Sequence, residues 1–331
     1  MDTRPSLDPA IAEVRLAVRA ALAGLAPGDA VVVALSGGAD SLALTAAAAF
    51  EAPKLGVRAV AVTVDHGLQQ GSADAAALAA DRAAALGIEA RVVRVDVGAD
   101  GGPEASARAA RYAALAAEAS AIDARAVLVG HTLDDQAETV LLGLARGSGA
   151  ASLQGMAPAG ELTSGIALLR PLLGVRRGIT RAACLAQRVE PWEDPHNADR
   201  RFARVRVREA VLPVLEAELG PGIAEALART ALQLREDAAA FDEMIHETIE
   251  DIVEHAEAGI SVSVAALAAN PAALRHRIIR RVVAAEFGAS LTRTQTLEVA
   301  RLVTDWSGQG PIDLPGCRVR RAGGRLEFTA S

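Results

Sequence analysis

The sequence is short of cysteine, and this shortage excludes several kinds of site. Cys184 and Cys317 are its two cysteines, and they stand far apart in a chain of 331 residues. Two distant cysteines exclude a disulfide framework, a cysteine-rich zinc site and an iron–sulfur cluster held by cysteines.

Long apolar runs and a signal-like start are absent as well. No stretch of about 18 uncharged apolar residues is present to cross a membrane. The first ten residues, MDTRPSLDPA, lack the basic start and apolar core of a secretory signal. We therefore expect a cytoplasmic protein without a membrane segment.

Positive charge is in deficit, because the formal net charge is −7. General affinity for nucleic acid comes from neutralising phosphates, so an acidic chain is a poor general binder. Any RNA contact must therefore come from a local basic patch.

The first half of the chain alternates apolar runs with helical patterns. Val-rich runs separated by helix-length segments predict a parallel sheet covered on both faces, which is an α/β fold. Ligands of such sheets bind at the carboxyl ends of the strands. Polar motifs begin at three of these ends, at Ser36, Asp65 and His131, so we expect the site there. The runs span 30–35, 57–64, 90–95 and 126–129, and helices are expected over 41–50, 72–86 and 103–121.

The pattern changes after about residue 212. A helix, a break at 220–222 and a long amphipathic helix are expected first. Further helices are predicted around 271–287 and 292–305, and a hairpin turning at Gly323-Gly324 ends the chain. We expect two domains, a nucleotide-binding domain over 1–213 and a smaller, mostly helical substrate domain over 214–331.

The stretch VVVALSGGADSLAL, residues 31–44, runs a buried strand through a glycine turn into a helix. The glycines let the backbone approach an anion, while the helix start and two flanking serine hydroxyls would donate to phosphate oxygens. The usual phosphate loop carries a lysine where this chain has Asp40. A carboxylate repels phosphate, so we expect Asp40 to hold a Mg²⁺ that bridges the phosphates. The alternative is a strand–turn–helix capped by Ser36.

SGGxDS resembles the signature of the PP-loop ATP pyrophosphatases, which bind the pyrophosphate of ATP and transfer AMP to a substrate. Within that superfamily the chain resembles the tRNA(Ile)-lysidine synthetases, over nearly all of the first domain and into the second. The resemblance implies a fold like that of the adenine nucleotide alpha hydrolases, with ATP, Mg²⁺, L-lysine and a CAU-anticodon isoleucine tRNA as cofactors and partners. It makes the second domain, 214–331, the expected tRNA-binding domain. A homodimer is compatible with the sequence, which does not determine the oligomeric state. The motifs that carry the resemblance are VTVDHGLQ (63–70), EASARAARYAAL (104–115), GHTLDDQAETVLLGLARGSG (130–149), LQGM (153–156), RPLL (170–173) and WEDPHNADRRFARVRVREAVLPVLE (192–216).

Acidic residues cluster after the fourth apolar run. Asp134 and Glu138 are four apart, so a helix would place them on one face, beside Asp135. Carboxylates near a strand end could hold a metal, bind an ammonium group or accept its proton. The alternative is an acidic first turn favoured by the helix dipole. The resemblance implies that they serve ATP–Mg²⁺ and lysine recognition, without saying which does which, and His131 joins them as a catalytic candidate.

Arg108 and Arg111 lie three apart on an expected helix and so face one side. Guanidinium suits planar recognition of phosphate or carboxylate, and the alternative is a solvated helix face. The resemblance places basic residues of this segment near the reacting phosphate. Asp65 and His66 are expected to contact the nucleotide, with turn formation as the alternative. The expected ATP-binding residues are Ser36, Gly37, Gly38, Ala39, Asp40, Ser41, Asp65 and His66.

RRFARVRVR, residues 200–208, carries five arginines in nine residues. In a helix, Arg200, Arg204 and Arg208 would form one stripe, and these are the expected contacts to tRNA phosphates. The alternatives are a strand and a salt-bridged interdomain helix. The family usually has an asparagine where this chain has Val205.

The leading functional hypothesis is a ligase that replaces the 2-oxo group of the wobble cytidine, position 34, with lysine. ATP would adenylate that oxygen and release pyrophosphate, and the lysine amine would then displace AMP. One alternative is a PP-loop tRNA thiolase, which generally needs a cysteine pair or a cluster. An amidotransferase-type synthetase would need an ammonia source, and a non-catalytic nucleotide-sensing RNA binder would need fewer carboxylates.

Overall fold

The computed structural model describes residues 7–331 apart from 68–70, 99–102, 148, 194–198 and 257–258. The motif residues at 68–70, 148 and 194–198 therefore lie outside the described residues. The chain groups into two compact units, Met1–Leu234 and Arg235–Ser331. The grouping changes inside the long helix α10 (Ile223–Ile252). The domain division expected after residue 213 stays a prediction.

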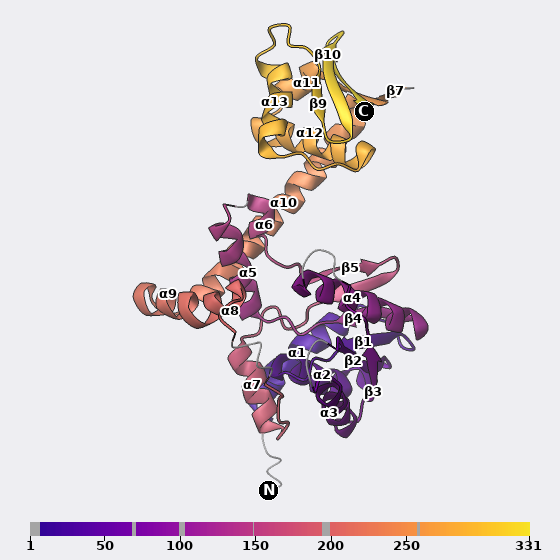
Figure 1. Cartoon of the computed structure of the whole chain (residues 1–331), viewed down its shortest axis with the longest axis vertical. Coiled ribbons are helices and arrows are strands. Elements are labelled where there is room, and N and C mark those ends of the chain that lie inside the picture. Colours follow the sequence, from indigo (N-terminus) through magenta and orange to yellow (C-terminus); the bar gives the residue numbers. More distant parts are fainter. Residues whose placement is uncertain (1–6, 68–70, 99–102, 148, 194–198, 257–258) are drawn as a thin grey trace. The chain divides into compact units, whose positions relative to one another are not determined.

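The first unit is built on a six-stranded sheet with the order β3-β2-β1-β4-β6-β5 (Figure 1). Its strands are parallel except for the edge strand β5, so the expected parallel sheet is confirmed. The hairpin that adds β5 and β6 to the sheet was not predicted. The strands are β1 (Ala30–Ala34), β2 (Arg58–Asp65), β3 (Glu89–Arg94), β4 (Ala124–Leu128), β5 (Ala159–Thr163) and β6 (Ile166–Leu169).

Helices cover both faces of this sheet, which explains its continuous apolar strands. Because neighbouring side chains of a strand point to opposite faces, Val31 and Val33 enter one core cluster while Ala30 and Val32 enter another. The first cluster packs against α1, α2, α3 and α7, and the second packs against α4. These helices are α1 (Pro9–Leu22), α2 (Ala39–Glu51), α3 (Ser72–Ala85), α4 (Pro103–Ala121) and α7 (Arg177–Ala186).

The order of the strands places a crevice beside β1. From β1 the chain adds β2 and β3 on one side and then returns to add β4 on the other. In open α/β sheets such a switch point leaves a crevice at the carboxyl ends of the two strands. The segments that follow β1 and β4 therefore meet there, and they are the two segments expected to carry the chemistry.

Helices complete the first unit. The predicted helix, break and long helix are confirmed as α9 and α10.

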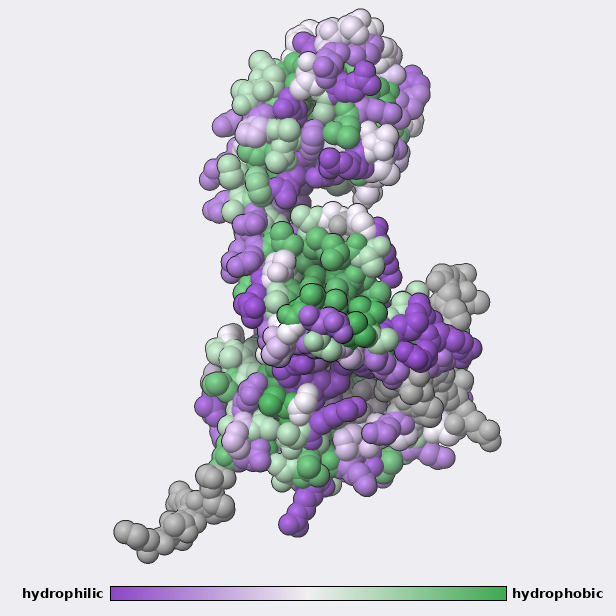
Figure 2. All heavy atoms as spheres, turned by 90° about the vertical axis from the view of Figure 1, so that its left-hand side faces the viewer, coloured by the Kyte–Doolittle hydropathy of each residue, from purple (hydrophilic) through white to green (hydrophobic). Residues whose placement is uncertain are grey.

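No helix among the described residues is long and apolar enough to span a bilayer. Apolar side chains gather on the face that carries α9 (Figure 2), where Val211, Val214 and Leu219 are exposed. The helices and helical turns are α5 (Leu133–Ala145), α6 (Ala150–Leu153), α8 (Ala203–Arg206), α9 (Leu212–Leu219), a π-helical turn (Val207–Val211) and a 3-10 turn (Pro53–Leu55).

The second unit packs helices against a five-stranded antiparallel sheet with the order β7-β8-β11-β10-β9. The predicted hairpin is confirmed, since β10 and β11 turn at Gly323 and Gly324, both with positive φ. The two helices expected after residue 270 are also confirmed, whereas β7, β8 and β9 were not anticipated. The elements are β7 (Val253–Ala256), β8 (Gly259–Ser263), α11 (Val264–Ala269), α12 (Ala272–Phe287), α13 (Arg293–Thr304), β9 (Ile312–Leu314), β10 (Cys317–Ala322) and β11 (Arg325–Ala330).

Candidate active site

The loop after β1 leaves the start of α2 open to an anion. Gly38 is the N-cap residue, and no side chain caps the first N–H groups of the helix. The Ser41 hydroxyl is buried, donates to the Gly38 carbonyl (2.9 Å) and accepts from the Ser36 N–H (3.1 Å). Gly37 holds a positive φ of 81°, which favours glycine. The loop is therefore braced from inside by Ser41, while backbone N–H groups remain available at the helix start.

A close backbone contact brings the segment after β4 onto this loop. A Cβ at Gly130 would lie 3.2 Å from the backbone carbonyl of Asp40 and from the Ser41 nitrogen. A side chain here would push the neighbouring backbone away by a few tenths of an ångström, which glycine avoids. His131 and the start of α5 therefore lie beside the loop, as the strand order predicts.

The acidic residues of α5 gather around one cation, Arg177 at the start of α7. Its guanidinium lies 2.8 Å from Asp135 Oδ1, 3.2 Å from Glu138 Oε1 and 3.5 Å from Asp40 Oδ2. Its backbone N–H donates to Asp134 Oδ2 (2.7 Å). Asp134 and Glu138 thus share a helix face, as expected, and Arg177 contacts all the acidic candidates.

Burial and charge act in opposite directions in this acidic cluster. Burial raises the pKa of Asp135, but Arg177 and the hydrogen bonds from Thr132 hold it below its usual range. Burial lowers the pKa of Arg177, but Asp135, Glu138 and Asp40 raise it overall. The cluster is therefore a set of mutually stabilised charges.

Glu138 has no accessible oxygen left for a ligand. Its side chain is 0% exposed, and the Arg208 guanidinium donates hydrogen bonds to both of its oxygens, at 2.7 Å and 3.1 Å. With Arg177 on the same carboxylate, both oxygens have partners. Asp134 likewise accepts the Arg177 N–H and lies 3.4 Å from Arg176. A substrate ammonium could therefore reach Glu138 only after the arginines moved, whereas the Asp134 side chain remains partly exposed.

Of the three carboxylates paired with the Arg177 guanidinium, Asp40 has the longest contact. One oxygen accepts a short hydrogen bond from the Thr180 hydroxyl, and the other has the 3.5 Å contact with Arg177. Burial raises the pKa of Asp40, while Thr180 and Arg177 oppose that rise. An oxygen ligand with one loosely held lone pair beside an anion-binding helix start fits a bridging Mg²⁺. Among the described residues no group of three or more His, Cys, Asp and Glu is arranged to hold a metal, so phosphate and water would supply the other ligands.

A second set of side chains near His131 is basic. Arg108 and Arg111 on α4 lie against the Tyr112 ring, at 5.0 Å and 5.8 Å from its centroid. Arg170 donates to the Ala157 carbonyl (2.7 Å). Burial lowers the pKa of Arg111, and the neighbouring Arg108 adds to this effect. None of these three arginines forms an ion pair within the part of the chain that the structure describes, so the basic set lacks a counter-ion.

His131 is affected by charges of both sets. Burial lowers its pKa to about 4, and Arg170, Arg108 and Arg111 also lower it while Asp135 opposes them. The imidazole is therefore neutral near pH 7, and its buried Nδ1 has no partner among the described residues.

The two residues after β2 differ in their roles. Asp65 is buried and accepts from the Gly67 N–H (2.9 Å), which stabilises the turn that follows the strand. That hydrogen bond and one from Ser72 lower its pKa. Burial and the nearby Arg111 lower the pKa of His66, whose Nδ1 lacks a partner among the described residues. His66 thus lies near Arg111, and nucleotide contact by Asp65 and by His66 stays a prediction.

The expected stripe of three arginines on one helix is not formed. Helix α8 begins at Ala203, so Arg200 precedes it, and a π-helical turn separates it from α9. Pro213 has no N–H for the carbonyl four residues before it, so an α-helix cannot run unbroken here. Arg208 binds Glu138 and Arg204 donates to Thr139 (3.2 Å), so both face α5. Contact with tRNA phosphates stays a prediction for all three arginines.

The motif reading missed α7, which supplies Arg177 and Thr180. The signal was an electrostatic mismatch, because Arg176 and Arg177 stand where the helix dipole disfavours cations. Two adjacent arginines at a helix start indicate carboxylates supplied by another element. Further along, Cys184 contacts the Ala39 carbonyl (3.3 Å), and the Trp192 N–H donates to the Gly37 carbonyl (2.9 Å). Residues 177–192 therefore support the loop from behind.

Comparison with known proteins gives matches over both units. A family model described as a PP-loop domain matches residues 13–215, and one described as the TilS substrate binding domain matches residues 263–327. A tRNA(Ile)-lysidine synthase of Leifsonia xyli subsp. xyli is 60% identical over 92% of this chain and 91% of its own. Proteins of the same name from Salinispora tropica and Thermobifida fusca are 52% and 50% identical over 97% of this chain, and the matches cover 97% and 98% of those proteins.

A solved structure shares the fold at low sequence identity. The U34-tRNA thiolase NcsA from Methanococcus maripaludis, with its 4Fe-4S cluster, is 20% identical with a TM-score of 0.59. The match covers 69% of this chain and 79% of that one. At this identity the likeness concerns the fold alone.

Proposed function

Because this chain belongs to the tRNA(Ile)-lysidine synthase family, we propose that it joins L-lysine to C2 of the wobble cytidine, position 34, in a CAU-anticodon isoleucine tRNA. Members of this family are ligases, and the PP-loop domain is the part that uses ATP. We infer an adenylated tRNA as the intermediate. A homodimer and a cytoplasmic location stay predictions.

The observation that carries the proposal is that three features meet at the carboxyl ends of the strands. They are the uncapped start of α2, the Asp40 carboxylate with its one weak ion pair, and the three arginines without carboxylate partners. The start of α2 can bind phosphate through its N–H groups, and Asp40 beside it can hold Mg²⁺. Arg108, Arg111 and Arg170 provide positive charge that no carboxylate of the described residues neutralises. This distribution of charge suits a bound nucleoside triphosphate.

The proposed chemistry has two displacements. The cytidine O2 attacks the α-phosphate of ATP, the bond to the β-phosphate breaks, and pyrophosphate leaves. The lysine amine then attacks C2, the bond between C2 and its oxygen breaks, and AMP leaves with that oxygen while the amine loses a proton. Bound Mg²⁺ would supply charge neutralisation to the phosphates. The arginines of the basic set would stabilise the charge that develops on the phosphates.

Asp134 and Glu138 are both candidates to bind the ammonium group of the substrate lysine. Asp134 and Glu138 were the expected partners, and both are occupied by Arg176, Arg177 and Arg208. Lysine binding at Glu138 would require the ammonium group to take the place of a guanidinium, whereas Asp134 is partly exposed. The neutral and partly exposed imidazole of His131 could accept a hydrogen bond or a proton from the attacking amine.

The runner-up activity is a tRNA thiolase, since one protein of similar fold carries that name. Two features of this chain disfavour it. Cys184 and Cys317 are its two cysteines, and they fall in different units. Burial raises the pKa of both thiols, which keeps them protonated rather than reactive.

Mass spectrometry of the tRNA tests the proposal. The protein is incubated with unmodified CAU-anticodon isoleucine tRNA, ATP and Mg²⁺, with and without lysine. With lysine we expect the tRNA to gain one lysine residue. Without lysine we expect pyrophosphate and adenylated tRNA in amounts stoichiometric with the enzyme. A tRNA carrying uridine at position 34 is the matched control and should gain nothing.

Two results would contradict the proposal. Formation of lysyl-adenylate without adenylated tRNA would show that the amino acid is activated instead of the base. Incorporation of sulfur from a persulfide donor would support the thiolase.

A further inference from the structure

The buried side chain of Gln136 on α5 holds a short segment of backbone, residues 154–158, which runs from α6 to β5. The amide Nε2 donates to the Met156 carbonyl (3.0 Å), and the amide Oε1 accepts from the Met156 N–H (2.7 Å). Both backbone polar groups of Met156 are therefore bound by one side chain. The segment has no regular secondary structure of its own, so this pair of hydrogen bonds fixes its course.

The segment fits tightly against α5. A Cβ at Gly155 would lie 2.5 Å from the Gln136 Oε1 atom, and Gly155 has a positive φ of 60°. A side chain at this position would strain the backbone and collide with the amide. A Cβ at Gly143, further along α5, would lie 3.3 Å from the Ser152 carbonyl oxygen. The chain is therefore in close contact with α5 both at the segment and just before it.

Arg170, which follows β6, is attached to the same segment. Its Nη1 donates to the Ala157 carbonyl (2.7 Å), and its backbone N–H donates to the Pro158 carbonyl (2.8 Å). Ala157 directly follows Met156 in the chain. The carbonyl that orients the guanidinium therefore lies one residue beyond the residue that Gln136 holds.

The acceptors around the Arg170 guanidinium are neutral. Burial lowers the pKa of Arg170, and Tyr112 opposes this effect in part through a hydrogen bond. Arg170 in turn lowers the pKa of His131, so the two side chains lie near each other. Neutral acceptors orient a guanidinium without cancelling its charge. The positive charge of Arg170 therefore remains available to phosphates at this site.

We propose that Gln136 positions Arg170 for the adenylation step. By holding Met156, the amide fixes the neighbouring carbonyl, and that carbonyl fixes the guanidinium. This inference rests on the proposed function, which supplies the triphosphate on which Arg170 acts. A misplacement of about 1 Å can slow a reaction roughly a hundredfold, so a small displacement of the segment is enough to slow adenylation. Gln136 is thus a positioning residue that acts through Arg170.

A double-mutant cycle tests the route through Arg170. Gln136→Met keeps the length of the side chain but loses both hydrogen bonds, and it should slow single-turnover formation of adenylated tRNA about tenfold to a hundredfold at saturating ATP. The half-saturating ATP concentration should change by less than about twofold, because the charge on the phosphates develops in the transition state. The double variant Gln136→Met/Arg170→Gln should be no slower than Arg170→Gln alone. Losses that multiply in the double variant would overturn the inference.

The chain has one tyrosine, Tyr112, and this gives a readout that does not depend on turnover. Fluorotyrosine incorporated there yields one fluorine resonance, which reports on the guanidinium groups around the ring. Gln136→Met should move this resonance in the same direction as Arg170→Gln does. An unmoved resonance together with native circular dichroism would overturn the inference. If Gln136→Met loses native circular dichroism, Gly155→Ala takes its place, because it displaces the segment from the other side of the same contact.

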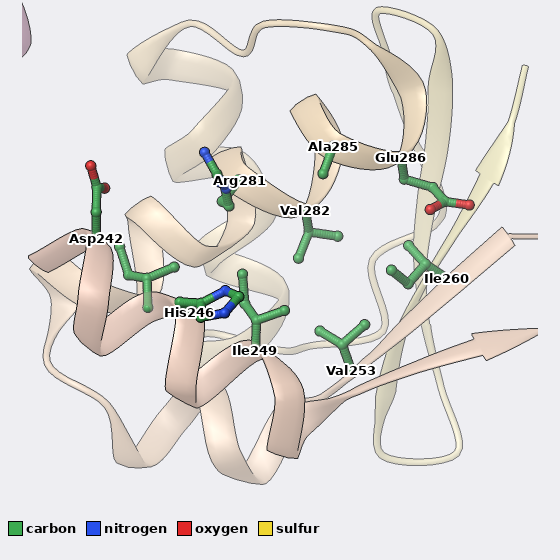
Figure 3. Close-up of a pocket in the computed structure, with 10 residues that line it drawn as sticks. Asp242, His246, Ile249, Val253, Ile260, Arg281, Val282, Ala285 and Glu286 are labelled. Atoms are coloured by element: carbon green, nitrogen blue, oxygen red, sulfur yellow. The ribbon is translucent and has the colours of Figure 1, made fainter. Parts of the chain in front are cut away.

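Two controls separate positioning from a general loss of stability. Leu141→Ala removes apolar contacts of α5 on another side of the helix from Gln136, since residues three and four apart share a face. Val282→Ala widens a hollow of about 280 Å³ between α10 and α12 in the second unit, which Ile249 also lines (Figure 3). Both variants should melt at a lower temperature and keep the wild-type resonance and adenylation rate.

A shift of the resonance in either control as large as that in Gln136→Met would overturn the inference. If the wild type forms no adenylated tRNA, the proposed function fails. The fluorine resonance still shows in that case whether Gln136 positions Arg170.

Discussion

Thr180 is the residue that most directly controls the geometry of Asp40. It is fully buried, and its hydroxyl holds one carboxylate oxygen so that the other can face the loop. Thr180→Val keeps the volume but removes the hydrogen bond, so the Mg²⁺ concentration for half-maximal pyrophosphate release should rise about tenfold.

Asp40→Asn should remove most adenylation while leaving the fold and tRNA affinity nearly intact.

Thr180→Ser retains the hydroxyl and is the matched control, with an Mg²⁺ requirement close to that of the wild type. Direct titration of Mn²⁺ by its paramagnetic signal, in the presence of a nonhydrolysable ATP analogue, gives a readout separate from turnover. An unaltered Mg²⁺ requirement together with a lower melting temperature would reassign Thr180 to packing.

His131 should make stability depend on pH. Its pKa is about 4 in the folded chain and 6.5 as an ordinary value, so between these values the unfolded chain binds more protons. Stability from the neutral imidazole is therefore complete above pH 6.5 and is lost as the pH falls towards 4. His131→Asn should lose less unfolding free energy than the wild type over this range, by at most about 3 kcal/mol.

Urea unfolding of both proteins at several pH values between 4 and 7 measures the difference. Asp135, whose pKa is lowered, also loses its contribution in acid, but it is present in both proteins. Parallel pH profiles would show that His131 is not shifted as the structure indicates.

At the scale of elements, the acidic cluster ties α5 to α7 and α8. Glu138 is contacted by Arg177 from one helix, while Arg208 reaches it from the π-helical turn after α8. Glu138→Gln keeps the shape but leaves two partly buried guanidinium groups short of a negative charge, so it should reduce the unfolding free energy by about 3 kcal/mol. Single-turnover formation of adenylated tRNA then shows whether adenylation or lysine use is also lost.

The combination of Glu138→Gln with Arg208→Gln separates the ion pair from the rest of the site. Because the two side chains contact each other, the double variant should lose clearly less than the sum of the single losses. Additive losses in chemical denaturation would mean that the pair contributes little. Arg201→Gln is a suitable control, since Arg201 is exposed and pairs locally with Asp199.

Sequence patterns predicted the elements that run through a single stretch of chain. The Val-rich runs identified β1 to β4, and helical spacing identified α4 and α12 to within a residue or so. Short strands such as β5 and β9 escaped, because three to five residues are too few to show a period. The helix through Arg200 was placed too early, since Pro213 and the π-helical turn change the register.

The acidic residues of the candidate site could be predicted from the sequence, whereas the contacts that α7 and α8 make with them could not. Asp40, Asp134 and Glu138 stood out by motif and spacing, and the strand order brings them together. The pairing of Glu138 with Arg208, and of Asp40 with Thr180, depends on how α7 and α8 fold back. Such contacts between distant segments leave no local pattern in one sequence.

At the scale of the whole molecule, each unit has its own core. The cluster around Phe328 and Val319 lies entirely in the second unit and shares no residue with the clusters around the parallel sheet. Phe328→Ala should therefore destabilise the second unit by about 3–5 kcal/mol and leave the first largely unaffected. Hydrogen exchange followed by mass spectrometry should show faster exchange in α12 and β10 but not in β1 or β4.

Leu128→Ala in β4 is the reciprocal change, since Leu128 is fully buried in the first unit. It should speed exchange in β1 and β4 and spare β10. Faster exchange throughout the chain in both variants would mean that the two units unfold as one cooperative body.

The contact between Thr180 and Asp40 joins positions 140 residues apart, and this separation has a consequence for synthesis on the ribosome. At roughly 5–20 residues per second, Thr180 follows Asp40 by on the order of ten seconds, and Arg208 follows later still. During that interval the nascent chain can pair β1 with β4 and bring Asp40 beside Asp135 before either meets Arg177. The acidic centre is thus completed only when α7 and α8 have emerged, past the middle of translation, and supply its positive charges.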